Sequence, residues 1–172
     1  MFAGAGRTCL PVALLMLLFS APAGAADRLE LAVGKGSEQL DAARLAWQRP
    51  WIWQQALGEN ATVTGYHALS VNHWWNAHES ITTLGYSPIF IYQDNGSPWY
   101  FQGGIGLAYL SDIRIGGRIL STRFQFEDQI GIGWQHRQHG LGLVYRHYSN
   151  AGIEKPNHGI DLLLFSYSLT LD

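Results

Sequence analysis

The sequence predicts an all-β protein, specifically an eight-stranded antiparallel transmembrane β-barrel. Apolar and polar side chains alternate in eight short segments, and turn sequences such as "QDNGSP" separate several of them. After the N-terminal segment, no apolar run is long enough to span a membrane as a helix. Eight strands of about 10 residues each match the smallest membrane barrels. The expected strands are residues 28–34, 40–48, 62–75, 84–92, 99–109, 124–134, 140–150 and 160–171.

The N-terminal segment, residues 1–25, has the order of a secretory signal peptide. A basic residue precedes an apolar run, and small residues follow up to Ala25. The apolar run is too short to cross a bilayer as a helix. We expect cleavage after Ala25 or Ala26, which leaves residues 26–172 as a single barrel domain. The only cysteine, Cys9, belongs to the leader, so the mature chain does not rely on disulfides.

Residues 99–109 display the alternation most clearly. One face carries Trp99, Phe101, Gly103, Ile105, Leu107 and Tyr109, and the other carries Tyr100, Gln102, Gly104, Gly106 and Ala108. A soluble sandwich or a lipocalin-like barrel also alternates, but it turns its apolar faces inward. Aromatic residues at the ends of the apolar faces, with small or polar residues opposite, favour the membrane barrel.

The connections predict the orientation of the barrel. With a periplasmic N-terminus, the connections after strands one, three, five and seven are external, and those after strands two, four and six are short periplasmic turns. The expected external loops are residues 34–40, 76–80, 110–119 and 150–159, and the expected turns are "LGEN", "QDNGSP" and "QHRQHG". Pro88 removes a hydrogen-bond donor from its strand and predicts a bulge or bend there.

Other residues have structural interpretations. We expect all seven tryptophans, at positions 47, 51, 53, 74, 75, 99 and 134, to form interfacial girdles. Parity places Arg44, Glu127 and Arg146 inside a barrel too narrow to conduct. His67 and His73 have no convincing third ligand, so no metal site and no cofactor are expected. A net charge of −2 argues against a nucleic-acid partner.

One group of polar residues does not fit this pattern. His147, Ser149 and Asp161 fall on lipid-facing sides at the external ends of adjacent strands, and Asp128 does likewise on the preceding strand. An ionisable group facing lipid costs about 2–4 kcal/mol at the membrane midplane for a basic residue, and less near the interface. A histidine, a hydroxyl and a carboxylate together indicate nucleophilic acyl transfer. The alternative is that these groups merely meet lipid headgroups.

Two stretches carry a resemblance to a known family. "FEDQIGIG" and "HYSNAGIEKPNHGID" match the patterns F-E-D-x-I-G-x-G and H-Y-S-N-A-G-x-x-x-P-N-x-G-I-E. These patterns are similar to those of the lipid A 3-O-deacylases (the PagL family), which are eight-stranded outer-membrane barrels. The match is strong in the last third of the chain and thins upstream to fragments such as "TGY" and "SPIFIY".

The resemblance implies a serine esterase of the bacterial outer membrane. Its partner would be lipid A or lipopolysaccharide in the outer leaflet, from which it removes the ester-linked 3-hydroxyacyl chain at the 3-position, with a monomer sufficient. His147 would be the general base and Ser149 the nucleophile. Asn150 and the backbone N–H of Gly152 would form the oxyanion hole, and Asp128 would hold the hydroxyl of the departing chain.

The chain departs from the family pattern at Asp161, where the family has a glutamate. The shorter carboxylate must come about one methylene closer to His147. Glu154 and His158, in the same loop, are rival partners or bystanders. The rival functions are another outer-membrane lipid esterase or acyl transferase, such as a phospholipase, or a non-catalytic structural barrel whose site has decayed. A soluble barrel that binds apolar ligands is a third alternative.

Overall fold

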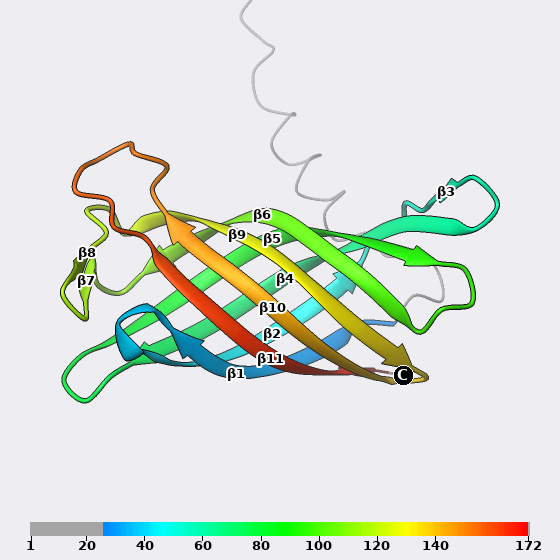
Figure 1. The fold of residues 1–172 in the computed structure, drawn as a ribbon, viewed down its shortest axis with the longest axis horizontal. Coiled ribbons are helices and arrows are strands. Elements are labelled where there is room, and N and C mark those ends of the chain that lie inside the picture. Colours follow the sequence, from blue (N-terminus) through cyan, green and yellow to red (C-terminus); the bar gives the residue numbers. More distant parts are fainter. Residues whose placement is uncertain (1–25, 172) are drawn as a thin grey trace, which may run out of the picture.

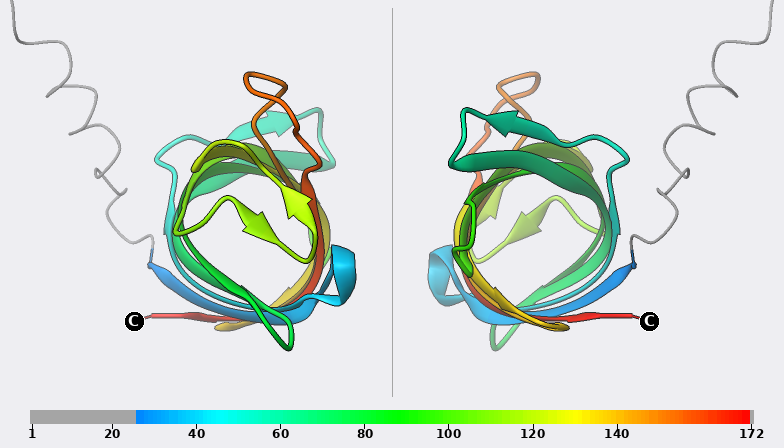
Figure 2. Two further views of the ribbon diagram at one scale, coloured as in Figure 1. Left: turned by 90° about the vertical axis from the view of Figure 1, so that its left-hand side faces the viewer. Right: turned by 90° about the vertical axis from the view of Figure 1, so that its right-hand side faces the viewer.

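The computed structural model describes residues 26–171, which form a closed antiparallel β-barrel (Figure 1). The leader expected at residues 1–25 lies outside the described residues. The wall strands are β1 (Arg28–Gly36), β2 (Asp41–Pro50), β4 (Ala61–Trp75), β5 (Ser80–Asp94), β6 (Trp99–Leu110), β9 (Phe124–His136), β10 (His139–Ser149) and β11 (Ile160–Thr170). Each pairs with the next, and β1 pairs with β11, which closes the ring seen end-on in Figure 2. All eight expected strands are confirmed.

The connections differ in length at the two ends of the barrel. Among the described residues, the connections at one end contain the short elements η1 (Ser37–Gln39), β7 (Arg114–Ile115) and β8 (Arg118–Ile119). At the other end, β3 (Gln55–Leu57) pairs with β4, so the β2–β4 connection is longer than the tight turn expected there. Figure 2 shows β7 and β8 lying across the mouth at the first end. Residues 26–171 contain no helix long and apolar enough to span a membrane.

The barrel wall is apolar outside and mostly polar or small inside, as the period-two pattern predicts. Ile130 is 66% exposed, whereas its neighbour Gln129 on β9 is buried. The outward side chains of the other strands follow the same rule, for example Leu31, Leu84 and Ile105. This arrangement is the reverse of a soluble sandwich or a lipocalin and matches a barrel surrounded by lipid.

Four buried charges occupy the barrel interior and balance one another. The Arg44 Nε atom donates to Glu30 at 3.0 Å, and both Arg44 and Arg146 donate to Glu127. The Tyr148 hydroxyl also donates to Glu127, at 2.9 Å. Two carboxylates face two guanidinium groups, so none of these buried charges is left without an opposite charge. The interior placement of Arg44, Glu127 and Arg146 is confirmed.

Trp74 is the exception among the tryptophans and corrects the girdle prediction. Its side chain is fully buried and packs edge-to-face on Tyr148, with ring centroids 4.5 Å apart. Trp74 follows Asn72 on the inward face of β4, and it fills the barrel near the mouth together with Ile115 and Leu120. The cause is parity: an inward position at this level needs a large apolar side chain to exclude water.

Pro88 interrupts the hydrogen-bonded ladder between β5 and β6 without the extra residue that a β-bulge would insert. The register between β5 and β6 runs from Thr83 to Tyr86, stops, and resumes at Phe90 with the same offset. The missing N–H of the proline removes a donor at this point. The bend expected there is therefore a local gap in pairing.

Candidate active site

The polar residues predicted from parity come together at the mouth where β7 and β8 lie. His147 on β10 lies opposite Asp128 on β9 and opposite Asp161 on β11. Ser149 is the last residue of β10 and projects from the same face as His147, because side chains two residues apart along a strand share a face. Tyr148, between them, points into the interior and is buried. Four polar groups thus form one patch on the outer wall.

The closest contact in this patch joins His147 to Asp161. The imidazole Nδ1 lies 2.7 Å from the Asp161 Oδ1 atom, and both side chains are partly exposed. Since a carboxylate accepts at Nδ1, the hydrogen-bond network assigns the proton to that nitrogen and leaves Nε2 with a free lone pair. The shorter carboxylate therefore reaches the imidazole without a gap.

Two further residues hold Asp161. The Tyr145 hydroxyl donates to Oδ1 at 2.5 Å. The Ser37 hydroxyl, in the β1–β2 connection, lies 3.3 Å from Oδ2 and accepts the Asp161 backbone N–H at 3.0 Å. Neither residue was predicted from the sequence. Ser37 precedes Asp161 by 124 positions, so only the closure of β1 on β11 brings them together.

Gly159 sets the position of the imidazole. Its backbone has a φ of +64°, and a Cβ built there would lie 2.8 Å from His147 Cε1. Because real Cβ atoms do not approach other atoms so closely, any side chain at this position would displace the imidazole. The glycine belongs to the matched motif, but the motif alone gives no reason for it.

The Ser149 hydroxyl has no hydrogen-bond partner within residues 26–171. Unbound enzymes often have long or unformed nucleophile–base contacts that tighten only with substrate. Asp128 is likewise partly exposed, next to the imidazole across the β9–β10 ladder. Both groups therefore remain available to a ligand.

The loop after Ser149 is organised by Asn150, which is only 1% exposed. Its amide nitrogen donates to the carbonyl oxygens of Leu120 at 3.0 Å and Glu154 at 2.8 Å. Its amide oxygen accepts the Gly152 N–H at 2.9 Å. In this structure both predicted oxyanion donors are thus engaged, Gly152 within the loop and Asn150 with the loop and the β8–β9 connection, and their catalytic role stays a prediction.

The rival acids and bases of the loop have other partners. His158 Nδ1 accepts the Ile119 N–H at 3.2 Å, and the His158 N–H donates back to the Ile119 carbonyl. His158 therefore docks the loop onto β8. Glu154 contributes its backbone carbonyl to Asn150, and its side chain is exposed. In the described part of the chain, no group of three or more His, Cys, Asp and Glu side chains is arranged to hold a metal.

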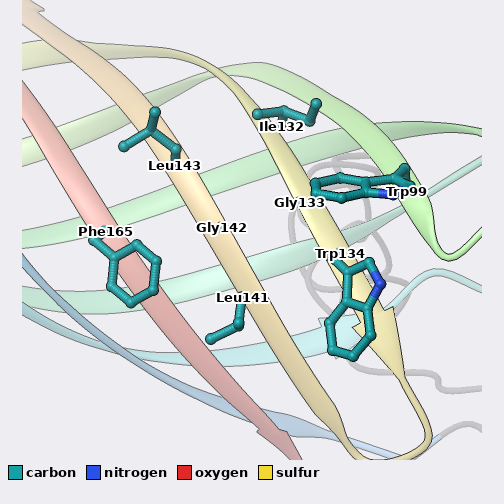
Figure 3. A pocket seen from close by; sticks show the side chains of 8 residues that line it. All are labelled: Trp99, Ile132, Gly133, Trp134, Leu141, Gly142, Leu143 and Phe165. Atoms are coloured by element: carbon teal, nitrogen blue, oxygen red, sulfur yellow. The ribbon is translucent and has the colours of Figure 1, made fainter.

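An apolar groove of about 410 Å³ lies on the outer wall along the same strands (Figure 3). It is lined by Trp99, Ile132, Gly133, Trp134, Leu141, Gly142, Leu143 and Phe165. The groove does not contain the polar patch. Leu143 lies four residues before His147 on the same face of β10, a separation of roughly 13 Å. The groove therefore lies on the same outer wall, further along the strands from the rim that carries the patch.

The fold and the patch together define an outer-membrane β-barrel enzyme: a closed barrel with an apolar outer wall that carries a serine, a histidine and a carboxylate at one rim. More particularly, the chain belongs to the lipid A 3-O-deacylase (PagL) family, whose model matches residues 41–170. That match includes every residue of the patch.

Individual relatives agree with this assignment. The chain is 35% identical to lipid A deacylase PagL of Pseudomonas aeruginosa, over 95% of this chain and 96% of that protein. It is 28% identical to lipid A deacylase PagL of Bordetella bronchiseptica, over 72% of each. The crystal structure of the outer membrane enzyme PagL superposes with a TM-score of 0.79 at 28% identity, covering 84% of this chain and 99% of that one. A de novo designed transmembrane β-barrel, at 11% identity and a TM-score of 0.51, shows the fold alone.

Proposed function

We propose that this protein hydrolyses the ester-linked 3-hydroxyacyl chain at the 3-position of lipid A with a Ser149–His147–Asp161 triad. The observation that carries the proposal is the 2.7 Å contact between His147 Nδ1 and Asp161 Oδ1, beside Ser149 on the outer wall. Membership of the deacylase family supports the choice of substrate. The partner is lipid A within lipopolysaccharide.

In the proposed reaction, the Ser149 hydroxyl attacks the ester carbonyl while His147 Nε2 accepts its proton. Asp161 keeps the imidazole in the required tautomer and stabilises the imidazolium that forms. The imidazolium then protonates the departing sugar oxygen, which leaves an acyl-serine. A water molecule, deprotonated by His147, hydrolyses this ester and releases a free 3-hydroxy fatty acid.

Asn150 and Gly152 are proposed to stabilise the oxyanion of the tetrahedral intermediate. The Gly152 N–H now donates to a neutral amide oxygen, and a charged oxyanion is a stronger acceptor. Substrate therefore competes for this donor, and the loop adjusts as the intermediate forms. An oxyanion-hole donor typically contributes a factor of about 10²–10³ to kcat.

The orientation of the patch supports a substrate that never leaves the membrane. The triad faces outward at the end of the barrel that we assign to the outer leaflet, where the ester of lipid A lies just below its headgroup. The acyl chain would lie along the apolar wall formed by Phe126, Ile130, Leu143 and Leu163, toward the groove of Figure 3. Asp128 would accept the 3-hydroxyl of that chain.

Mass spectrometry of lipid A after incubation with the refolded barrel tests this function. We expect the wild-type protein to remove a single 3-hydroxyacyl chain from hexa-acylated lipid A, and Ser149→Ala to remove none. Cleavage of phospholipid without cleavage of lipid A would instead establish a phospholipase. A folded barrel that cleaves neither would overturn the enzymatic proposal.

A further inference from the structure

The carboxylate of Asp161 has more partners than a triad requires. Its Oδ1 atom accepts from both His147, at 2.7 Å, and the Tyr145 hydroxyl, at 2.5 Å. Its Oδ2 atom lies 3.3 Å from the Ser37 hydroxyl, and Ser37 also accepts the backbone N–H of Asp161. The carboxylate is thus contacted from β10 on one side and from the β1–β2 connection on the other.

The register explains why Tyr145 can reach this carboxylate. Tyr145 lies directly opposite Leu163, and Asp161 occupies the diagonal position two residues earlier on β11. Diagonal neighbours on one face of an antiparallel pair are about 7–8 Å apart, a span that a long aromatic side chain can bridge. Tyr145 is otherwise a lipid-facing residue, and a phenol there needs a partner for its hydroxyl.

We propose that Tyr145 and Ser37 are positioning residues that hold the short Asp161 carboxylate against the imidazole of His147. The proposal rests on the function proposed above. Aspartate has one methylene fewer with which to reach across the β10–β11 ladder, so its carboxylate has little freedom to adjust. The Tyr145 hydroxyl binds the same oxygen that accepts from the imidazole, and Ser37 restrains the opposite oxygen. Neither residue touches the ester.

A double-mutant cycle between Tyr145→Phe and Asp161→Glu tests the role of the tyrosine. Phenylalanine retains the ring and loses only the hydroxyl. With Asp161 present, we expect Tyr145→Phe to lower kcat for lipid A roughly 10-fold with KM unchanged. A longer carboxylate reaches His147 unaided, so in the Asp161→Glu background the same change should lower kcat by no more than about twofold. An equal loss in both backgrounds would overturn the proposal.

Tyr167→Phe is the matched control. Tyr167 is also a lipid-facing tyrosine whose hydroxyl bonds a histidine, His139 Nδ1 at 2.8 Å, but it lies at the other end of the barrel. Its loss should leave kcat unchanged. If Tyr167→Phe lowered kcat as much as Tyr145→Phe, the effect would be a general one on the wall and the proposal would fail. Ser37→Ala should lower kcat less than Tyr145→Phe does. An unchanged kcat in Ser37→Ala would show that Ser37 is not a positioning residue.

Labelling of Ser149 by a fluorophosphonate separates this proposal from the proposed function. The serine oxygen displaces fluoride from phosphorus and His147 accepts the proton, so the rate reports activation of the nucleophile without lipid A. We expect Tyr145→Phe to slow labelling by the same factor as deacylation. If lipid A were untouched while Ser149 still reacted and Tyr145→Phe slowed it, only the substrate would be wrong. If the wild-type protein deacylated lipid A and Tyr145→Phe changed neither rate, only the positioning role of Tyr145 would be wrong. An unreactive Ser149 would overturn both.

Discussion

The inside of the barrel and the rim of its outer wall use the same kinds of polar side chain in opposite ways. Inside, Glu30 and Glu127 face Arg44 and Arg146, and every one of these buried charges contacts an opposite charge. At the rim, within residues 26–171, His147 contacts Asp161, which Tyr145 and Ser37 also contact. Among the four patch residues, Asp128 and Ser149 have no side-chain partner in this part of the chain.

The difference shows how polarity divides between stability and chemistry in a small barrel. Buried charges are tolerated when they are paired, and removal of one partner is strongly destabilising. Polar groups that face lipid without full pairing cost stability, and they commonly mark functional sites. If the two sets are separable, substitutions inside the barrel should change stability and substitutions at the rim should change catalysis.

The largest expected effect comes from His147→Gln. Glutamine fills similar space but cannot accept the Ser149 proton, so kcat for lipid A should fall at least about 10³-fold. The barrel should still fold, as judged by its heat-modifiable migration in gels. A folded variant that keeps near-normal kcat would contradict the assignment of the base, and a variant that unfolds would contradict the purely catalytic role of His147.

Glu127→Gln should act on stability. The change leaves Arg44 and Arg146 facing one carboxylate fewer in a site from which water is excluded, and the free energy of unfolding should fall by about 3–5 kcal/mol. Urea unfolding in lipid vesicles measures it. Glu59→Gln, at an exposed turn position, is the control and should change stability by less than about 0.5 kcal/mol. Equal losses would contradict the paired interior.

Gly159→Ala should displace the imidazole and lower kcat roughly 10²-fold, since a misplacement of about 1 Å has that effect in enzymes. Gly58→Ala controls for backbone strain. Both glycines have a φ of +64°, but a Cβ at Gly58 would meet nothing within 4 Å, whereas one at Gly159 would meet His147. If the two variants lose similar stability but only Gly159→Ala loses kcat, the result supports the contact between residue 159 and His147. Unchanged kcat at Gly159 would refute it.

The smallest effect is expected for Asp128→Asn. If Asp128 accepts the 3-hydroxyl of the departing chain, the variant should lose about 10-fold in kcat/KM for a 3-hydroxyacyl ester and little for an unhydroxylated one. Rates with the two esters side by side measure the difference. A similar loss on both would mean that Asp128 affects the imidazole instead.

Much of the fold follows from the sequence because the period-two pattern is clear in most wall strands, and it is weaker in β5, where Ile89 and Ile91 face inward. Parity placed His147, Ser149 and Asp161 on one face, and the structure brings them together at one rim. Parity also assigns Trp74 to the interior, because it lies two residues after Asn72 on the same face of β4. The general preference of tryptophan for the interfaces of membrane barrels predicts the opposite and is wrong at this position.

The contacts that hold the site could not be predicted from local pattern. Ser37 meets Asp161 only because the first and last strands pair, and their register is set by the whole ring. Gly159 affects the site because its backbone lies so close to the His147 imidazole that a Cβ would not fit. The sequence motif includes this glycine but does not reveal the contact. Such effects depend on three-dimensional closure, which no short stretch of sequence encodes.

The most direct test compares Ser149→Ala and Glu127→Gln in one lipid A digestion read by mass spectrometry, with equal amounts of folded barrel. If the interior charges serve stability and the rim residues serve catalysis, Glu127→Gln still releases one 3-hydroxyacyl chain and Ser149→Ala releases none. Deacylation by Ser149→Ala, or its absence from correctly folded Glu127→Gln, would contradict that separation.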